Sequence, residues 1–357
     1  MKAKELMDIR RQIDILDQRI MELLNKRMEI CLKTRRFKKH IVDLKREEEV
    51  LENIRRSSYH LLRPDFSERL YSLIIEESRA IQQMDYKLIG FQGEHGAYSE
   101  AAILSYRPEL VPVPCREFKD IFDDIEAGIL DYGIVPIENS IEGAVTYVND
   151  LLIERNLVII KEIIIPVHHC LLALPGTDFK SLKAVYSHPQ ALAQCRNFIM
   201  KHKLEPKPFY DTAGAAKMLS EEKPEASCVI ANRLSARLYH LSVIRENIED
   251  YPSNSTRFIV LSKDPLDEEG DKCSIIFSLQ HKVGALFSIL KIFYEASVNL
   301  TRIESRPTKE SPGNYVFFID FEGSNRDEKI VHMLETIKEN TTTFKFLGCY
   351  KSAKRGG

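Results

Sequence analysis

Arg27 and Lys38 are the first residues whose spacing suggests chemistry. They lie eleven positions apart in a glycine-free stretch, and at about 100° per residue a helix returns them to within about 20° of one face. Roughly 16 Å would separate them along the axis, so two cations could bracket a small dianion. Arg27 also continues an apolar seam, where an unpaired charge is costly. The residues alone leave two alternatives open, a polar pocket or a plain coiled-coil dimerisation helix.

A second polar group follows a buried strand. Glu138, Asn139 and Ser140 end an apolar run that begins at Tyr132. Open α/β sheets bind ligands at the carboxyl ends of their strands, so this edge is a candidate binding site. Two further polar segments, at 186–190 and 253–258, accompany strand-forming sequence.

Two other patterns exclude common cofactor sites. The glycines at 90–96 have the spacing G-x-x-G-x-x-G, which is not the dinucleotide fingerprint; they fit either a tight turn or a carboxylate held at a helix start. His168 and His169 have no acidic or thiolate partners at ligand spacing. We therefore expect no metal and no cofactor. His169 and Glu138 also fit the role of buried, hydrogen-bonded groups.

Three modules must position these residues. All fifteen glycines lie at or beyond Gly90, so we predict helices at about 4–39, 43–57 and 65–84, forming an all-α module at 1–85. Residues 86–263 alternate strand and helix, which predicts an α/β module. A polar linker at 263–271 leads into strand–helix–strand–strand–helix–strand, an α+β ferredoxin-like module at 272–357.

Composition limits the cellular compartment and the kinds of partner that we expect. The net charge is −2, so no basic field favours nucleic acid. The seven cysteines are scattered, as in proteins of a reducing compartment. No apolar run is long enough to span a membrane, and the charged N-terminus does not resemble a signal peptide. We expect a cytoplasmic protein that contacts neither membrane nor nucleic acid.

The helical module resembles the all-helical chorismate mutase family over its full length, through segments at 10–17, 23–27, 43–47 and 74–83 together with Lys38. The resemblance implies rearrangement of chorismate to prephenate, with the substrate held in a reactive conformation. It assigns chorismate contacts to Arg10 of a partner chain, Arg27, Lys38, Asp43, Arg46, Glu47, Ser78 and Gln82. Lys38 and Gln82 are the expected catalytic residues, because both suit charge that develops on the ether oxygen.

The central module resembles the prephenate dehydratase family, through the combined segments 135–143, 187–190 and 256–258. One segment departs from the usual pattern, since Gln92 stands where proline is common. The resemblance implies a two-lobed fold similar to periplasmic binding proteins. Lobe one is expected at about 86–165 and 240–263, and lobe two at about 166–239.

The implied reaction converts prephenate to phenylpyruvate in a cleft between Asn139 and Thr256. Thr256 is the expected catalytic residue; a neutral threonine is a weak acid, so we expect it to orient and hydrogen-bond the leaving hydroxyl. Arg257 is open to either a binding or a structural role. The expected prephenate contacts are Glu138, Asn139, Ser140, Ser187, Gln190, Thr256, Arg257 and Phe258.

The C-terminal module resembles phenylalanine-sensing ACT domains, through segments at 284–287, 299–307 and 347–350. The resemblance implies that L-phenylalanine binds between two chains, in a homodimer or tetramer. A helix start at Gly284 suits its carboxylate, and Glu304 or nearby carbonyls suit its ammonium. The expected effector residues are Gly284, Ala285, Leu286, Asn299, Leu300, Glu304, Ser305 and Arg306.

These features predict a bifunctional, phenylalanine-inhibited enzyme of phenylalanine biosynthesis. One alternative is a dehydratase whose helical arm only dimerises. Another is an amino-acid sensor that binds phenylalanine without turnover.

Overall fold

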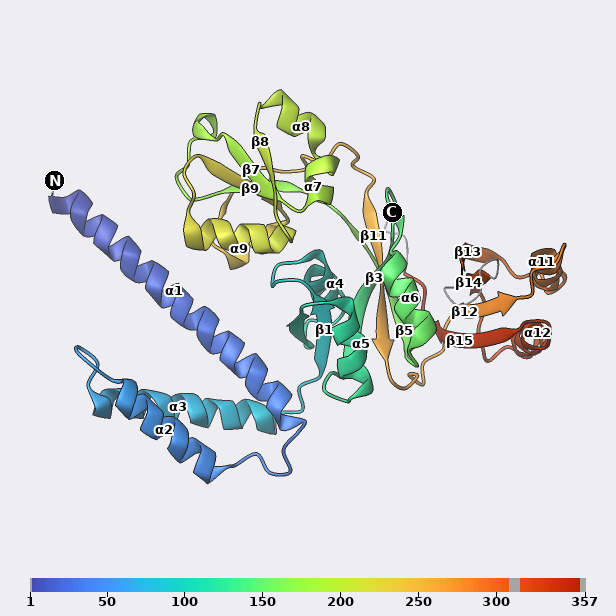
Figure 1. The fold of residues 1–357 in the computed structure, drawn as a ribbon, viewed down its shortest axis with the longest axis horizontal. Coiled ribbons are helices and arrows are strands. Elements are labelled where there is room, and N and C mark those ends of the chain that lie inside the picture. The colour runs from blue at the N-terminus through green and yellow to red at the C-terminus, as the bar shows by residue number, and fades with distance from the viewer. Residues whose placement is uncertain (1, 308–314, 354–357) are drawn as a thin grey trace. The chain divides into compact units, whose positions relative to one another are not determined.

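The computed structural model describes residues 2–307 and 315–353 (Figure 1). The chain folds into two compact units, Met1–Lys87 and Leu88–Gly357. Within the described residues, no helix is both long and apolar enough to cross a membrane.

The first unit consists of three helices, as the lack of glycine predicts. They are α1 (Lys2–Arg35), α2 (Leu44–Ser57) and α3 (Pro64–Gln83). Pro64 takes the first helical position of α3, where its missing N–H costs nothing. The Asp43 side chain caps α2 by accepting from the Arg46 backbone N–H at 3.1 Å. The prediction that α1 reaches residue 39 is wrong: the helix ends at Arg35, and Lys38 lies on the connecting segment.

The N-terminal half of α1 keeps its apolar seam uncovered. Side chains on this seam are 48–66% exposed, namely Leu6, Ile9, Ile13, Leu16, Ile20 and Leu23. Among the described side chains, the hydrogen bonds between α1 and α3 fall in the C-terminal half of α1, at Arg27 and Cys31. A single chain therefore does not bury the heptad that its sequence contains.

The second unit begins with a six-stranded sheet. Its order is β2-β1-β3-β11-β5, with β4 paired to β3. The strands are β1 (Leu88–Gln92), β2 (Val111–Cys115), β3 (Tyr132–Asn139), β4 (Gly143–Ala144), β5 (Val158–Pro166) and β11 (Ser255–Ser262). Helices α4 (Tyr98–Tyr106), α5 (Phe118–Glu126) and α6 (Thr146–Glu154) accompany it. Helix α6 begins at Thr146, after Gly143 and Ala144, which form β4.

A second sheet, of five strands, has the order β10-β6-β9-β7-β8. Its strands are β6 (Cys170–Ala173), β7 (Ala184–Ser187), β8 (Glu205–Pro208), β9 (Ser227–Ala231) and β10 (Ser242–Arg245). Its helices are η1 (Phe179–Ser181), α7 (Pro189–Gln194), α8 (Arg196–Lys201), α9 (Thr212–Glu222) and α10 (Arg233–Leu238). Cys195 separates α7 from α8. β10 pairs with β6, so the second lobe extends beyond the expected boundary at about 240.

The chain returns from the second sheet to the first through β11. This strand inserts antiparallel between β3 and β5, and Thr256 pairs with Asn139 on one side and Ile165 on the other. The first sheet thus contains both polar segments that the sequence places more than a hundred residues apart.

The C-terminal module has the predicted βαββαβ order. Its elements are β12 (Lys272–Leu279), α11 (Ala285–Glu295), β13 (Leu300–Pro307), β14 (Tyr315–Glu322), α12 (Glu328–Glu339) and β15 (Thr343–Tyr350). The four strands form one antiparallel sheet in the order β13-β14-β12-β15. Phe277, Phe293 and Phe321 lie in its core.

Candidate active sites

The helical unit contains a cavity of about 480 Å³. Six of the eight expected chorismate residues line it: Arg27, Lys38, Arg46, Glu47, Ser78 and Gln82. Asp43 serves instead as the cap of α2. Arg10 is exposed on the uncovered half of α1 and does not line this cavity.

The polar side chains from α1 and α3 are held by direct contacts. Arg27 Nη1 donates to Ser78 Oγ at 2.5 Å. Gln82 Nε2 donates to the Cys31 carbonyl oxygen at 2.6 Å and lies 3.2 Å from Thr34 Oγ1. Gln82 is 4% exposed. The neutral amide donor that the sequence suggested is therefore buried at the cavity wall.

Arg79 is a cavity residue that the sequence analysis missed. Its Nε donates to Glu47 Oε1 at 2.7 Å, and this hydrogen bond raises the pKa of Arg79. The spacing of Ile75, Ser78, Arg79 and Gln82 is i, i+3, i+4, i+7, one helical face, and that spacing could have identified Arg79. Lys26, Arg27, Lys38, Arg46 and Arg79 outnumber the single carboxylate of Glu47 in the lining, so the cavity favours an anionic ligand.

A second cavity, of about 540 Å³, lies in the central module between residues of its two sheets. Asn139, Thr256 and Phe258 line it from the first sheet, and Gln190 and Gln194 line it from α7 of the second lobe. Four expected prephenate contacts are thus brought together: Asn139, Gln190, Thr256 and Phe258.

Asn139 fixes the hydroxyl of Thr256. Its Nδ2 donates to Thr256 Oγ1 at 3.0 Å and to Asn254 Oδ1 at 2.9 Å. Its Oδ1 accepts from the backbone N–H groups of Ile141 and Glu142, which sets the orientation of the amide. Because Thr256 Oγ1 accepts from Asn139, and donates to no group in the described part of the chain, its O–H remains available to a ligand in the cavity.

A hydrogen-bonded chain continues from Asn254 into the second lobe. Asn254 Nδ2 donates to Gln194 Oε1 at 3.1 Å, and His169 Nε2 lies 2.8 Å from the same oxygen. His169 Nδ1 lies 3.0 Å from the hydroxyl of Tyr98, on α4 of the first lobe. Burial lowers the pKa of His169 and raises that of Tyr98 well above its usual value. His169 is therefore a neutral, buried group, one of the two roles its sequence allowed.

Arg257 does not line this cavity. Alternate residues of a strand face opposite sides of a sheet, and Thr256 and Phe258 face the cavity. Arg257 points the other way, where its Nε lies 2.5 Å from Glu162 Oε2 and its Nη1 lies 2.7 Å from Asp320 Oδ2. Arg257 therefore takes the structural alternative.

Three other expected prephenate contacts also lie away from the lining. Glu138 Oε2 is 3.9 Å from Arg257 Nη1, Ser140 Oγ accepts from the Ser255 N–H, and Ser187 Oγ donates to the Ile230 carbonyl. The structural reason is the same for each: its side chain is directed toward the sheet or loop beside it.

Positive charge in this cavity comes from a residue that the sequence analysis did not single out. Among the described residues that line it, Arg116 is the sole lysine or arginine, and the carboxylates of Glu117 and Asp211, the N-cap residues of α5 and α9, line it as well. The first turn of α4 also contributes Tyr98 and Ser99 to the lining. The glycine segment therefore does reach the cavity. No cluster of metal-ligating side chains occurs in the described ranges.

The expected effector residues divide between α11 and β13. Gly284 caps α11 with φ +81°, in the left-handed region that glycine favours, and Ala285 and Leu286 pack on the module's core. Asn299 and Leu300 lie at the start of β13, and Ser305 is exposed on it. Glu304 Oε1 accepts from Asn149 Nδ2 of α6 at 3.0 Å, and Arg306 pairs with Asp150 at 2.6 Å. The expected ammonium acceptor is thus engaged with the central module.

Comparisons with known proteins agree with this division. Three family models match: chorismate mutase type II over residues 9–83, prephenate dehydratase over 89–266, and ACT domain over 274–332. A bifunctional chorismate mutase/prephenate dehydratase from Aquifex aeolicus is 34% identical, over 98% of this chain and 99% of its own length.

Two solved structures are similar to the second unit. A prephenate dehydratase from Arthrobacter aurescens in complex with L-Phe is 33% identical, with a TM-score of 0.68, over 74% of this chain and 89% of its own. A protein described as a novel type of quorum quenching acylase is 32% identical, with a TM-score of 0.70, over 75% of this chain and 98% of its own. The near-full-length match decides between these descriptions: the chain belongs to the family of bifunctional chorismate mutase/prephenate dehydratases, and an ACT domain follows its two enzyme domains.

Proposed function

We propose that the chain converts chorismate to prephenate in the helical cavity and prephenate to phenylpyruvate in the central cavity, under inhibition by L-phenylalanine. The observation that carries the proposal is the hydrogen bond from Asn139 Nδ2 to Thr256 Oγ1. It leaves the threonine O–H as a directed donor at the wall of a cavity of substrate size.

In the dehydratase step, the bond between the ring and its carboxylate breaks and carbon dioxide leaves. The electron pair enters the ring and expels the hydroxyl on the opposite carbon, which takes up one proton and leaves as water. Thr256 hydrogen-bonds this departing oxygen, and the proton comes ultimately from solvent. Arg116 provides the cation for a substrate carboxylate, while Gln190 and Phe258 contact the ring.

In the mutase step, no nucleophile is needed, because the rearrangement is pericyclic. Arg27 and Arg46 hold the two carboxylates of chorismate, since guanidinium groups bind carboxylates in a bidentate manner. Lys38 and Gln82 stabilise charge on the ether oxygen. Glu47, oriented by Arg79, accepts from the ring hydroxyl. Each group acts by holding a reactive conformer or stabilising its transition state.

The mutase site is completed by a second chain. The uncovered seam of α1 is an apolar stripe with heptad spacing, which two copies would bury against each other. Arg10 lies on the same exposed half of α1 and reaches the partner's cavity rather than its own. L-Phenylalanine binds the C-terminal module near Gly284 and Ser305, again between two chains.

One coupled assay tests the proposal. The purified full-length chain is given chorismate, and separately prephenate, and phenylpyruvate is measured with and without L-phenylalanine. We expect phenylpyruvate from both substrates and less of it with the amino acid. Turnover of prephenate alone would show that the helices only dimerise. Binding of phenylalanine without turnover of either substrate would make the chain a sensor and refute the proposal.

A further inference from the structure

A buried cluster of charges joins the central module to the C-terminal module directly behind the proposed dehydratase site. Arg257 and Glu162 come from β11 and β5 of the first sheet, and Lys272 and Asp320 come from β12 and β14 of the C-terminal sheet. All four are at most 9% exposed. Two cations and two anions make the cluster neutral, which is how charges are tolerated in an interior.

Glu162 and Tyr350 complete the contacts. Glu162 Oε2 pairs with Lys272 Nζ at 2.7 Å as well as with Arg257 Nε. The hydroxyl of Tyr350, on β15, lies 3.2 Å from Arg257 Nη2 and 2.6 Å from Ser274 Oγ. Arg257 therefore contacts side chains of four strands, β3, β5, β14 and β15, and the last two belong to the C-terminal module.

The strand that carries Arg257 also carries Thr256. The β3–β11 pairing shifts register between Arg257 and Phe258, and bulges of this kind re-aim side chains beside active sites. On the cavity side, Asn139 holds Thr256. On the opposite side, the charge cluster holds the very next residue. The position of the Thr256 hydroxyl thus depends on two anchors, one in each module.

We propose that Arg257 is a positioning residue, whose ion pairs with Asp320 and Glu162 fix Thr256 and transmit the state of the C-terminal module to the dehydratase site. This inference rests on the proposed dehydratase function. A ligand that shifts β14 or β15 moves Asp320 or Tyr350, and Arg257 then moves the strand at the bulge. The effector and the leaving hydroxyl need no contact with each other.

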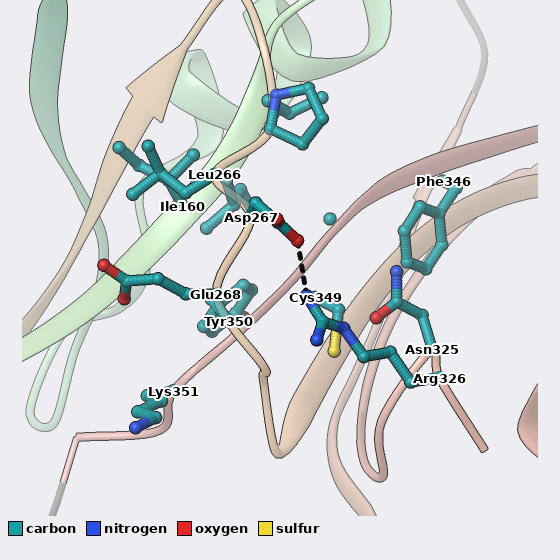
Figure 2. Close-up of a pocket in the computed structure, with 14 residues that line it drawn as sticks. Ile160, Leu266, Asp267, Glu268, Asn325, Arg326, Phe346, Cys349, Tyr350 and Lys351 are labelled. Atoms are coloured by element: carbon teal, nitrogen blue, oxygen red, sulfur yellow. Dashed lines mark hydrogen bonds and ion pairs between the residues drawn. The ribbon is translucent and has the colours of Figure 1, made fainter.

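An exposed ion pair between the linker and the C-terminal module offers a matched control. It lies at a cavity of about 410 Å³ between β5, the linker and β15, whose lining residues are drawn in Figure 2. Asp267 of the linker and Arg326 pair across it at 2.6 Å. The Asp267 side chain is fully exposed, so its loss leaves no buried charge. Asp267→Asn changes the same chemical group, in an ion pair with the same C-terminal module, away from Arg257.

The experiment compares Asp320→Asn, Tyr350→Phe and Asp267→Asn in the full-length chain. Dehydratase kcat and KM, mutase turnover, phenylalanine affinity by calorimetry and phenylalanine inhibition are measured for each. Asp320→Asn should lower dehydratase kcat by about tenfold, since small misplacements of reacting groups cost up to about a hundredfold, while KM changes little. Phenylalanine should still bind it with near wild-type affinity but inhibit it weakly. Tyr350→Phe should show both effects to a smaller extent, and Asp267→Asn neither.

Retained phenylalanine affinity with lost inhibition is a result that a merely structural contact would not produce. Wild-type kcat and full inhibition in both Asp320→Asn and Tyr350→Phe would overturn the inference. If Asp320→Asn fails to fold, shown by circular dichroism of the purified variant, Tyr350→Phe decides alone. Absence of prephenate turnover in the unmodified chain would instead overturn the proposed function, and the inference with it.

Discussion

Replacing Asn139 with aspartate removes the donor that orients Thr256 while keeping the shape of the side chain. The amide Nδ2 faces three oxygens, those of Asn254, Ser255 and Thr256, at 2.9–3.2 Å. An ionised carboxylate would face the same three oxygens without a hydrogen to share. The threonine O–H would then turn toward the new carboxylate and away from the substrate.

These contacts determine how much dehydratase activity and stability the variant should lose. Removing one positioned donor from a reacting oxygen costs about 2.7–4 kcal/mol, a factor of about 10² to 10³ in kcat, and we expect Asn139→Asp to fall in this range. Two acceptors, Asn254 Oδ1 and the Ser255 carbonyl oxygen, lose their donor, at about 1 kcal/mol each, so the free energy of unfolding should fall by about 2 kcal/mol. Circular dichroism of the same sample shows whether the variant is folded.

A double-mutant cycle with Thr256→Val tests whether Asn139 affects kcat through the hydroxyl of Thr256. If Asn139 acts through the hydroxyl of Thr256, the double variant is no slower than Thr256→Val alone, because the two residues act as a unit. Thr256→Ser, which keeps the hydroxyl, should retain most of the activity. A kcat for Asn139→Asp within about threefold of wild type, or losses that add in the double variant, would refute this account of the site.

Three further predictions concern both cavities. Replacing Arg27 and Lys38 together with alanine should lower mutase turnover by at least about a hundredfold and leave prephenate turnover unchanged; equal losses in the two assays would contradict separate sites. In Gln82→Glu, burial raises the pKa of the new carboxyl and only its protonated form donates, so mutase activity should fall as pH rises, whereas the wild-type profile stays flat; parallel profiles would remove Gln82 from the mechanism. Burial lowers the pKa of His169 below its usual 6.5. As pH falls below about 6.5, His169 therefore takes up a proton in the unfolded chain before it does so in the folded chain, and the free energy of unfolding should decrease. Urea titrations of dehydratase activity should show that loss in the wild type and less of it in His169→Gln.

Much of the architecture could be predicted from local sequence. The absence of glycine before Gly90 and the single early proline, Pro64, define three helices to within a few residues, apart from the end of α1. The βαββαβ order also follows from pattern, since strand and helix periodicities differ clearly. These are features that neighbouring residues determine.

Other elements depend on tertiary position. The strand β2 contains Pro112 and Pro114, which argue against a strand within a sheet. It forms at the edge, paired only with β1, where proline's missing N–H is tolerated. Gly348 provides a second example, since an added Cβ would lie 2.3 Å from the Ile159 carbonyl oxygen of another module. No local pattern announces such a close approach.

The surroundings of Arg257 depend on tertiary position in the same way. Thr256, Arg257 and Phe258 are adjacent in sequence, and the family resemblance grouped them as expected prephenate contacts while leaving Arg257 open to a structural role. In a strand, adjacency places side chains on opposite faces, and what covers the far face is Asp320 of a different module. The sequence contains the motif, but the partner that decides the role of its arginine is brought there only by folding.

The nature of Thr256 explains why such a partner matters. A neutral threonine hydroxyl cannot be made a strong acid, and its contribution to breaking the carbon–oxygen bond depends on where its hydrogen points. Catalysis by a titrating acid would be controlled by charge in the cavity, but catalysis by a placed donor is controlled by the strand that carries it. That strand lies between the amide of Asn139 and the charge cluster of Arg257. Regulation from the C-terminal module therefore requires only a displacement of β11, and no residue of that module has to enter the substrate cavity.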